Sequence, residues 1–375
     1  MRRQIHFINF SRKFAVNTVF FLVPLYFLKI GLNGWQIGVV MSFFAFAPLL
    51  FSFPAGWIND RLSMMRVIQG ALFALTLLFL ALARIHNFFA LATLFLSLGI
   101  ANNALDVSMN SLYFKDETEK DLNQKFGRFN FWLALGTATG ILLAGFLTYY
   151  ANFQVLLTVY ALFVFAVFLS IRNFNQAKFE VVPLREYKLN LFRKKTILFS
   201  ILIFVLASHW GVEGTVYTPF LKKHFALNNL QLAFYVSFAL FFLALSSFSI
   251  GLLRFNPQLN KRLFLLAMLL SGLGLIFMVQ TNVYLSFLFR CVHEIGDGFL
   301  GALVLLFISR QFEKRSIGGS SGALLAIQTM GHMAGALFFS PLGYKVGLQY
   351  PFFVAGSLLV ANSAFGYFVF RSEKY

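Results

Sequence analysis

The sequence predicts an all-α integral membrane protein with twelve transmembrane helices in two six-helix bundles and both termini in the cytoplasm. Three features predict this fold class: the composition, the length of the apolar runs and the placement of the basic residues. Of the 375 residues, 59% are hydrophobic and 12% are charged. A typical soluble domain carries about 25% charged residues. The mean hydropathy of +0.75 therefore indicates a chain that lies largely in lipid.

Apolar runs divide the chain into segments long enough to cross a bilayer. A transmembrane helix needs about 20 mostly apolar residues, whereas a barrel strand needs about 10 that alternate in polarity. The runs here are long and do not alternate, so we expect helices. The twelve expected spans are 9–30, 35–57, 67–84, 88–114, 129–149, 154–171, 197–221, 229–252, 263–280, 283–309, 322–344 and 350–370.

The basic residues fall mainly on one side of these spans. With the N-terminus placed in the cytoplasm, the cytoplasmic segments hold 25 of the 31 Lys and Arg residues, including Arg12 and Lys13. Cytoplasmic loops carry an excess of Lys and Arg, so this count orients both termini inside. Anionic lipid head groups account for the net charge of +18, and we expect no nucleic-acid partner. The expected location is the cytoplasmic (inner) membrane of a bacterium.

The longest polar stretch separates two halves of the chain. We expect an N-terminal six-helix bundle at 1–171, a cytoplasmic linker at 172–195 and a C-terminal six-helix bundle at 196–375. This layout resembles that of the major facilitator superfamily, whose halves are related by an axis along the membrane normal. The resemblance implies that spans 1, 4, 7 and 10 line a central cavity.

Ionisable side chains inside the apolar runs lie mostly in every third span. They are Asp106 in the fourth span, His209 and Glu213 in the seventh, Arg290, His293, Glu294 and Asp297 in the tenth, and His332 in the eleventh. An ionised group in hydrocarbon costs several kcal/mol, so such groups usually face a polar cavity or one another and mark a substrate or proton path. These positions therefore favour a transporter with a central cavity.

The loop after the second span resembles a signature loop of the same superfamily. The family pattern is Gly, three residues, Asp-Arg, one residue, Gly and then basic residues. Gly56, Asp60, Arg61 and Arg66 fit this pattern, whereas Ser63 stands at the second Gly and two Met residues replace basic ones. In the family the loop forms a charged latch across the cytoplasmic helix ends, where helix dipoles favour such charges. The resemblance implies a conformational latch here.

The fourth span carries a polar stripe at helical spacing. Its members are Asn102, Asn103, Asp106 and Asn110. The stretch 105–110, with 127–136 after it, resembles spans 4 and 5 of the fucose-permease-like branch of the superfamily. That branch has an acid followed four residues later by Asn, which implies proton and sugar handling for Asp106 and Asn110. The alternative is a structural stripe that hydrogen-bonds to neighbouring helices. For Asn102 and Asn103 the sequence favours neither the functional nor the structural role.

The tenth span contains two oppositely charged pairs, each four residues apart. Arg290 can neutralise Glu294, and His293 can neutralise Asp297. Lactose-permease-like proton symporters also place His and Glu near an Arg on this span, although the resemblance is in residue types only. The proton-coupling candidates are Asp106, Glu213, His293, Arg290, Glu294 and Asp297. The substrate-contact candidates are Asn103, Asn110, His209 and Trp210. A static charge network, or an anionic substrate held by Arg290, is the alternative.

These features predict a secondary active transporter that works by alternating access. We expect proton-coupled symport of a small polar metabolite such as a sugar, with sodium as the other possible coupling ion. Proton-driven efflux of amphipathic compounds and a non-transporting sensor or scaffold are the alternatives. The sequence has no P-loop, no His-Glu-x-x-His and no Gly-x-Ser-x-Gly motif, and its one cysteine is Cys291. We therefore expect no enzyme activity, no cofactor and no metal site, and a monomer in the membrane.

Overall fold

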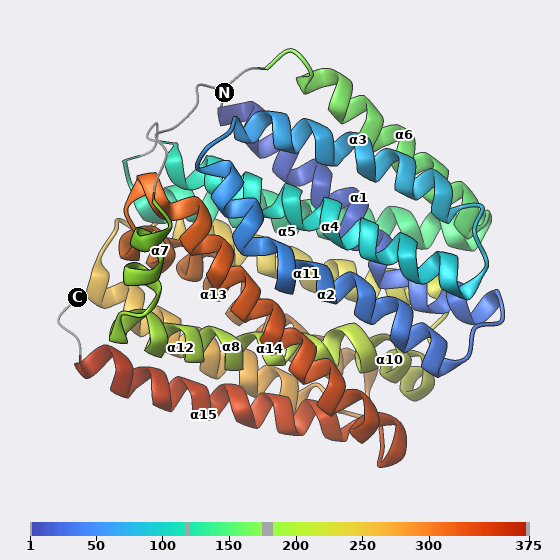
Figure 1. The fold of residues 1–375 in the computed structure, drawn as a ribbon. Helices are drawn as coiled ribbons and strands as arrows, with labels where there is room; N and C mark the ends of the chain where they lie inside the picture. The colour runs from blue at the N-terminus through green and yellow to red at the C-terminus, as the bar shows by residue number, and fades with distance from the viewer. Residues whose placement is uncertain (1, 117–119, 175–182, 373–375) are drawn as a thin grey trace.

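A computed structural model describes residues 2–116, 120–174 and 183–372, which form helices and contain no strand (Figure 1). This confirms the all-α class. Among the described residues, eleven helical segments are long and apolar enough to cross a membrane. Helix α1 (Arg2–Lys29) is not among the eleven, and it packs against α5 (Leu122–Tyr150) and α6 (Phe153–Ile171). The total of twelve spans stays a prediction, in which α1 would be the twelfth span.

The helices follow one another in two series. The first series continues from α1 with α2 (Gly34–Asn59), α3 (Met64–Leu82), α4 (Phe88–Lys115), α5 and α6. A short helix, α7 (Leu184–Leu191), comes between the series. The second series consists of α8 (Lys194–Ser208), α9 (Trp210–Val212), a π-helical turn η1 (Glu213–Tyr217), α10 (Thr218–Phe225), α11 (Asn229–Ile250), α12 (Pro257–Phe277), α13 (Val283–Gln311), the 3₁₀ turn η2 (Lys314–Ser316), α14 (Ile317–Lys345) and α15 (Tyr350–Ser372).

Side chains that accept backbone N–H groups begin many of these helices. The caps are Asn33, Asn87, Asp121, Asn152, Asn228, Asn256 and Asn282. Each satisfies donors that the first helical turn leaves without an intrahelical partner. Helices α2 and α11 start with the same capping box, formed by Asn33 with Gln36 and by Asn228 with Gln231. The two series therefore start their second long helix in the same way.

Close helix contacts also recur between the two series. A Cβ atom on Gly136 of α5 would lie 2.3 Å from the carbonyl oxygen of Phe10 in α1. A Cβ atom on Gly331 of α14 would lie 2.2 Å from the carbonyl oxygen of Phe204 in α8. Only glycine permits this approach, as expected where small residues let helices pack closely. The recurrence fits two related halves, while their boundaries at 1–171, 172–195 and 196–375 stay a prediction.

Both described ends of the chain, and α7, lie at one end of the helical bundle (Figure 1). We call it the basic end; it includes the loops 60–63 and 251–256 and the segment 183–193, which contains α7. In the predicted orientation it faces the cytoplasm. Arg12 lies ten residues into α1 from Arg2, about 15 Å along the helix, and is 2% exposed. The count of basic residues placed Arg12 and Lys13 in a cytoplasmic segment outside the spans. In the structure they lie inside helix α1 instead.

Candidate functional site

The segment from α8 to α10 is interrupted near its middle. Pro219 has no N–H group to offer the carbonyl of Thr215, and the hydroxyl of Tyr344 on α14 donates to that oxygen at 3.4 Å. Gly211 and Gly214 precede Pro219 in the sequence, and the π-helical turn begins between these two glycines, at Glu213. Turns of this kind occur often at functional sites. The apolar run predicted an unbroken span at 197–221, so the prediction missed this break, although the two glycines and the proline indicate it.

The interruption lies beside a cluster of ionisable side chains from this segment and from α13. We call it the histidine cluster; it comprises His209, Glu213, Arg290, His293, Glu294 and Asp297. The four α13 members share one face of that helix because the other three follow Arg290 by three, four and seven residues. All six were singled out from the sequence, and the structure brings them together.

Arg290 connects the two parts of the histidine cluster. Its Nη1 atom lies 2.5 Å from Oε1 of Glu213, and its guanidinium group also pairs with Glu294 one turn along α13. The guanidinium carbon lies 4.3 Å from the centre of the Tyr217 ring. Arg290 is 3% exposed, so its charge is balanced by these carboxylates rather than by bulk water.

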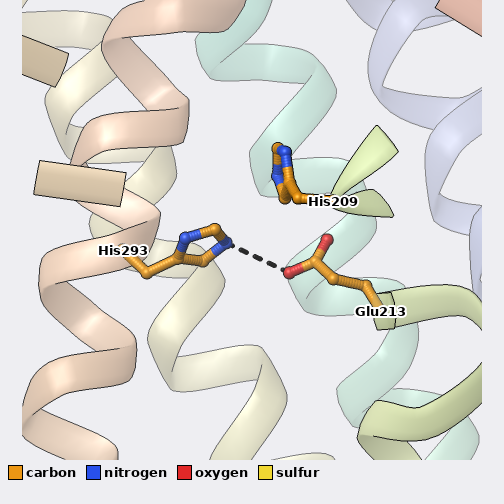
Figure 2. Close-up of side chains that lie close together, drawn as sticks. All are labelled: His209, Glu213 and His293. Atoms are coloured by element: carbon orange, nitrogen blue, oxygen red, sulfur yellow. Dashed lines mark hydrogen bonds and ion pairs between the residues drawn. The ribbon is translucent and has the colours of Figure 1, made fainter. Parts of the chain in front are cut away.

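The two histidines each face a carboxylate. Nε2 of His293 lies 3.1 Å from Oε1 of Glu213, as Figure 2 shows, and 3.8 Å from Oδ2 of Asp297. Nε2 of His209 lies 3.0 Å from the same Asp297 oxygen. The side chains of Glu213 and Asp297 are 23% and 11% exposed. The cluster is therefore mostly enclosed, but the carboxylates of Glu213 and Asp297 are partly accessible.

Three side chains of the cluster have the types and the spacing of metal ligands. One ligand atom each from His209, Glu213 and His293 lies within 4.8 Å of the other two. The sequence predicted no metal site because it has one cysteine and no His-Glu-x-x-His motif. This group instead combines two segments 80 residues apart.

A second cluster surrounds Asp106 of α4. Asp106 forms an ion pair with Arg12, and Nζ of Lys13 lies 3.1 Å from Oδ1 of Asp106. The amide of Asn102 donates to Oδ2 of Asp106 at 3.3 Å. The side chains of Asp106 and Lys13 are 20% and 13% exposed. Neither cation was predicted as a partner of Asp106, because both were counted among the basic residues of the cytoplasmic segments.

The remaining candidates lie around these two clusters. Asn103 is 1% exposed and accepts a hydrogen bond from Ser52 Oγ of α2 at 2.7 Å, so its side chain joins two helices. Asn110 is half-buried one turn from Asp106. Trp210 is half-buried, with its ring centre 5.7 Å from that of His209. Nε2 of His332 lies 3.2 Å from the position of a Cβ atom on Gly214.

Asp60, at the end of α2, connects four helices at the basic end. Its Oδ1 atom accepts from Nζ of Lys115 at 2.5 Å and from the backbone N–H of Gly318 at 3.2 Å. Its Oδ2 atom accepts from the Tyr187 hydroxyl at 2.9 Å and from the N–H of Gly319 at 2.8 Å. A carboxylate is favourable at the N-terminus of α14 because of the helix dipole and the free N–H groups there. We call these contacts the Asp60 latch.

The partners in the latch differ from those of the family pattern. Arg61 stacks on Trp57, with its guanidinium carbon 3.8 Å from the ring centre, and Arg66 is exposed. Lys115, from the end of α4, supplies the ammonium group instead. Burial and then the charge of Asp60 raise the pKa of Tyr187, which keeps its hydroxyl protonated as the donor.

Gly56 allows α2 to approach α14 closely beside the latch. We expect Gly56→Ala to weaken the closed latch by about 1–3 kcal/mol, because the new Cβ atom would lie 2.1 Å from the backbone oxygen of Gly318. Gly70→Ala on α3 is the matched control, since nothing lies within 4 Å of its Cβ position. Melting temperatures and uptake rates of both variants check this. Equal values for the two variants would contradict it.

A second set of contacts, besides the Asp60 latch, joins the two series of helices at the basic end. The side-chain amides of Asn123 and Asn260 donate to one another at 2.7 and 3.2 Å. Oδ2 of Asp121 accepts from the N–H of Phe255 at 3.1 Å, and Asn130 donates to Ser247 at 2.7 Å. With the Asp60 latch on the other side, the described contacts close the basic end in this conformation.

Comparison with known proteins places this architecture in a family. The model of the Major Facilitator Superfamily matches residues 5–259. The chain belongs to this superfamily. The crystal structure of the human organic anion transporter MFSD10 (TETRAN) is similar, with a TM-score of 0.78 over 97% of this chain and 99% of that chain. Its sequence is 14% identical, so the likeness shows the fold alone. No curated protein matches the sequence.

Membership of the major facilitator superfamily confirms several expectations. The chain is a multi-pass membrane transporter and not an enzyme. The Asp60 latch lies where the superfamily loop was recognised, although its basic partner comes from α4. The resemblance of α4 and α5 to the fucose-permease-like branch stays a prediction, as do the two termini in the cytoplasm.

Proposed function

We propose that this superfamily member is a proton-coupled symporter of a small polar metabolite that works by alternating access. The single observation that carries the proposal is the pair of charged clusters inside apolar helices, around Asp106 in the first series and around Glu213 and Asp297 in the second. Ionised groups are retained at such positions where they serve a substrate or ion path.

The Asp106 cluster suggests how proton and substrate binding would be linked. Two cations, Arg12 and Lys13, surround one carboxylate, which leaves one excess positive charge in a partly accessible place. Protonation of Asp106 would remove the negative charge between the cations and increase their attraction for an anionic group. A proton and an acidic substrate would then bind together, so an acid is favoured over a neutral sugar. Asn110, one turn away, is the proposed neighbouring substrate contact.

The Asp60 latch supports the alternating-access part of the proposal. With the basic end closed, substrate would reach the clusters from the opposite end, which is the outer side in the predicted orientation. Opening the basic end requires the latch contacts to separate and another set to replace them, so the transporter has two discrete states. The histidine cluster, with three carboxylates and Trp210 beside it, is the second proposed place of coupling.

Proton flux in proteoliposomes tests the proposal. A pH-sensitive dye outside the vesicles reports the response to a panel of organic acids, sugars and amphipathic cations. We expect external alkalinisation with an organic acid, because symport carries protons inward. Acidification would instead establish antiport, and equal responses with and without a sodium gradient would exclude sodium coupling.

We expect Asp106→Asn to lower substrate-driven proton flux at least about tenfold, because the amide removes the titrating group, while substrate exchange across the membrane continues. The exposed Glu313 at the basic end, replaced as Glu313→Gln, is the control and should keep the full flux. Unchanged proton flux in Asp106→Asn would refute the role of this carboxylate. Loss of both flux and exchange would indicate a structural role.

A further inference from the structure

Hydrogen bonds fix which ring nitrogen carries the proton in the two histidines of the histidine cluster. Nδ1 of His209 contacts the backbone oxygen of Leu206, and Nδ1 of His293 lies 3.0 Å from the backbone oxygen of Ser271. A carbonyl oxygen only accepts, so both Nδ1 atoms donate. The Ser271 hydroxyl donates to Oδ1 of Asp297 at 2.7 Å and therefore also accepts from His293, at 2.9 Å.

This assignment leaves Nε2 of both rings facing carboxylate oxygens. In a neutral imidazole with the proton on Nδ1, Nε2 is an acceptor. Two acceptors would then face one another at 3.0 Å in the His209–Asp297 pair and at 3.1 Å in the His293–Glu213 pair. Such contacts repel unless a positive charge lies between the atoms. Both pairs therefore require a cation.

The net charge of the cluster indicates how much positive charge is needed. With neutral histidines, Arg290 is opposed by the carboxylates of Glu213, Glu294 and Asp297, which leaves a net charge of about −2 in an enclosed site. Arg290 already pairs with Glu213 and Glu294. A single divalent cation beside the two Nε2 atoms would neutralise the cluster.

We propose that His209, His293 and Glu213 bind one divalent transition-metal cation of the Zn²⁺ type, with the negative charge of Asp297 beside it. Neighbouring ligand atoms in a tetrahedral Zn²⁺ site, with bonds of 2.0–2.1 Å, are about 3.3 Å apart. The His293 Nε2–Glu213 Oε1 distance of 3.1 Å is close to this value, and one ligand atom of each of the three residues lies within 4.8 Å of the other two. Imidazole with carboxylate is a donor set that suits Zn²⁺, Ni²⁺ and related ions.

The surroundings of the proposed site resemble those of known metal ligands in one further respect. Metal-binding histidines usually donate their other ring N–H to a carbonyl or carboxylate, which fixes the ring. His209 does so through Leu206, and His293 through Ser271. Oε1 of Glu213 contacts both Arg290 and His293, and a carboxylate oxygen has two lone pairs, so it can bind the metal while it still accepts from Arg290. Figure 2 shows the three side chains converging, with the Glu213 carboxylate facing the ring of His293 and lying below His209.

Calorimetric titration of the purified, tag-free chain in detergent tests the proposal without any transport measurement, so its failure is distinct from failure of the proposed function. After treatment with EDTA, we expect Zn²⁺ to bind one to one and Mg²⁺, which prefers octahedral oxygen ligands, not to bind. Co²⁺ at the same site should give the visible absorption of a tetrahedral complex. Absence of Zn²⁺ binding would overturn the proposal and leave two protons as the cations of the two pairs.

Variants locate the site. His209→Gln and His293→Gln should each weaken Zn²⁺ binding at least about tenfold, because each removes one ligand. His224→Gln is the matched control, since His224 is exposed and bonds to the backbone oxygen of Gln280 instead. Undiminished Zn²⁺ affinity in both cluster variants would overturn the assignment. Chromatographic profiles show whether the variants fold; if they do not, the titrations of the unaltered chain with Zn²⁺ and Co²⁺ decide.

Discussion

Asp60→Ala is expected to open the basic end and to reduce transport at least about tenfold. Asp60 is 0% exposed and accepts from the side chains of Lys115 and Tyr187 and from the N–H groups of Gly318 and Gly319. Removing one partner of a buried ion pair costs about 3–5 kcal/mol. The pair with Lys115 lies within the first series, whereas the bonds from Gly318 and Gly319 join α2 to α14, so the loss of these two bonds falls on the conformation in which the basic end is closed. Hydrogen bonds to a charged group contribute about 1.5–3 kcal/mol each, so the closed state would lose at least about two orders of magnitude in population relative to the open state.

Distances between spin labels measure this opening directly. Labels at Arg66 and Leu252, both exposed at the basic end, lie in different series, and Cys291→Ala removes the single native cysteine. We expect longer label distances in Asp60→Ala and unchanged distances in the control Glu313→Ala. Asp60→Asn should have a smaller effect, because its amide oxygen still accepts hydrogen bonds. Identical distances in Asp60→Ala and the unaltered chain would refute the latch.

Arg290→Met is expected to be the most destabilising single change in the histidine cluster, by about 3–5 kcal/mol. The substitution keeps most of the side-chain volume but removes the guanidinium group from between Glu213 and Glu294. Two carboxylates would then remain largely enclosed without their strongest partner. Thermal unfolding in detergent, followed by the fraction of monodisperse protein after heating, measures the loss.

A double substitution separates charge from packing in this prediction. In Arg290→Met with Glu294→Gln, one positive and one negative charge disappear together, so we expect part of the stability to return. The two effects should therefore not add, as is usual for residues in direct contact. Arg254→Met, at an exposed position of the basic end, should leave the melting temperature unchanged. Additive losses in the double variant would show that Arg290 acts through packing.

The position and type of most elements could be predicted from the sequence, because a bilayer-spanning helix is a local property of about 20 apolar residues. The expected span at 88–114 corresponds to the helix Phe88–Lys115, and the span at 283–309 corresponds to Val283–Gln311. Helical spacing also identified the pair of Arg290 with Glu294, which the structure confirms. The break near Glu213 was missed, since its cause lies partly in Tyr344 on another helix.

The sequence by itself determined the helices, the transporter class and which costly charges lie inside them, because these follow from local composition and periodicity. Only the tertiary structure decided the partners of those charges: Arg12 and Lys13 for Asp106, and Lys115, Tyr187 and the start of α14 for Asp60. Partners distant in sequence depend on which helix faces meet. Side-chain spacing within one helix does not encode that choice; close packing between helices does.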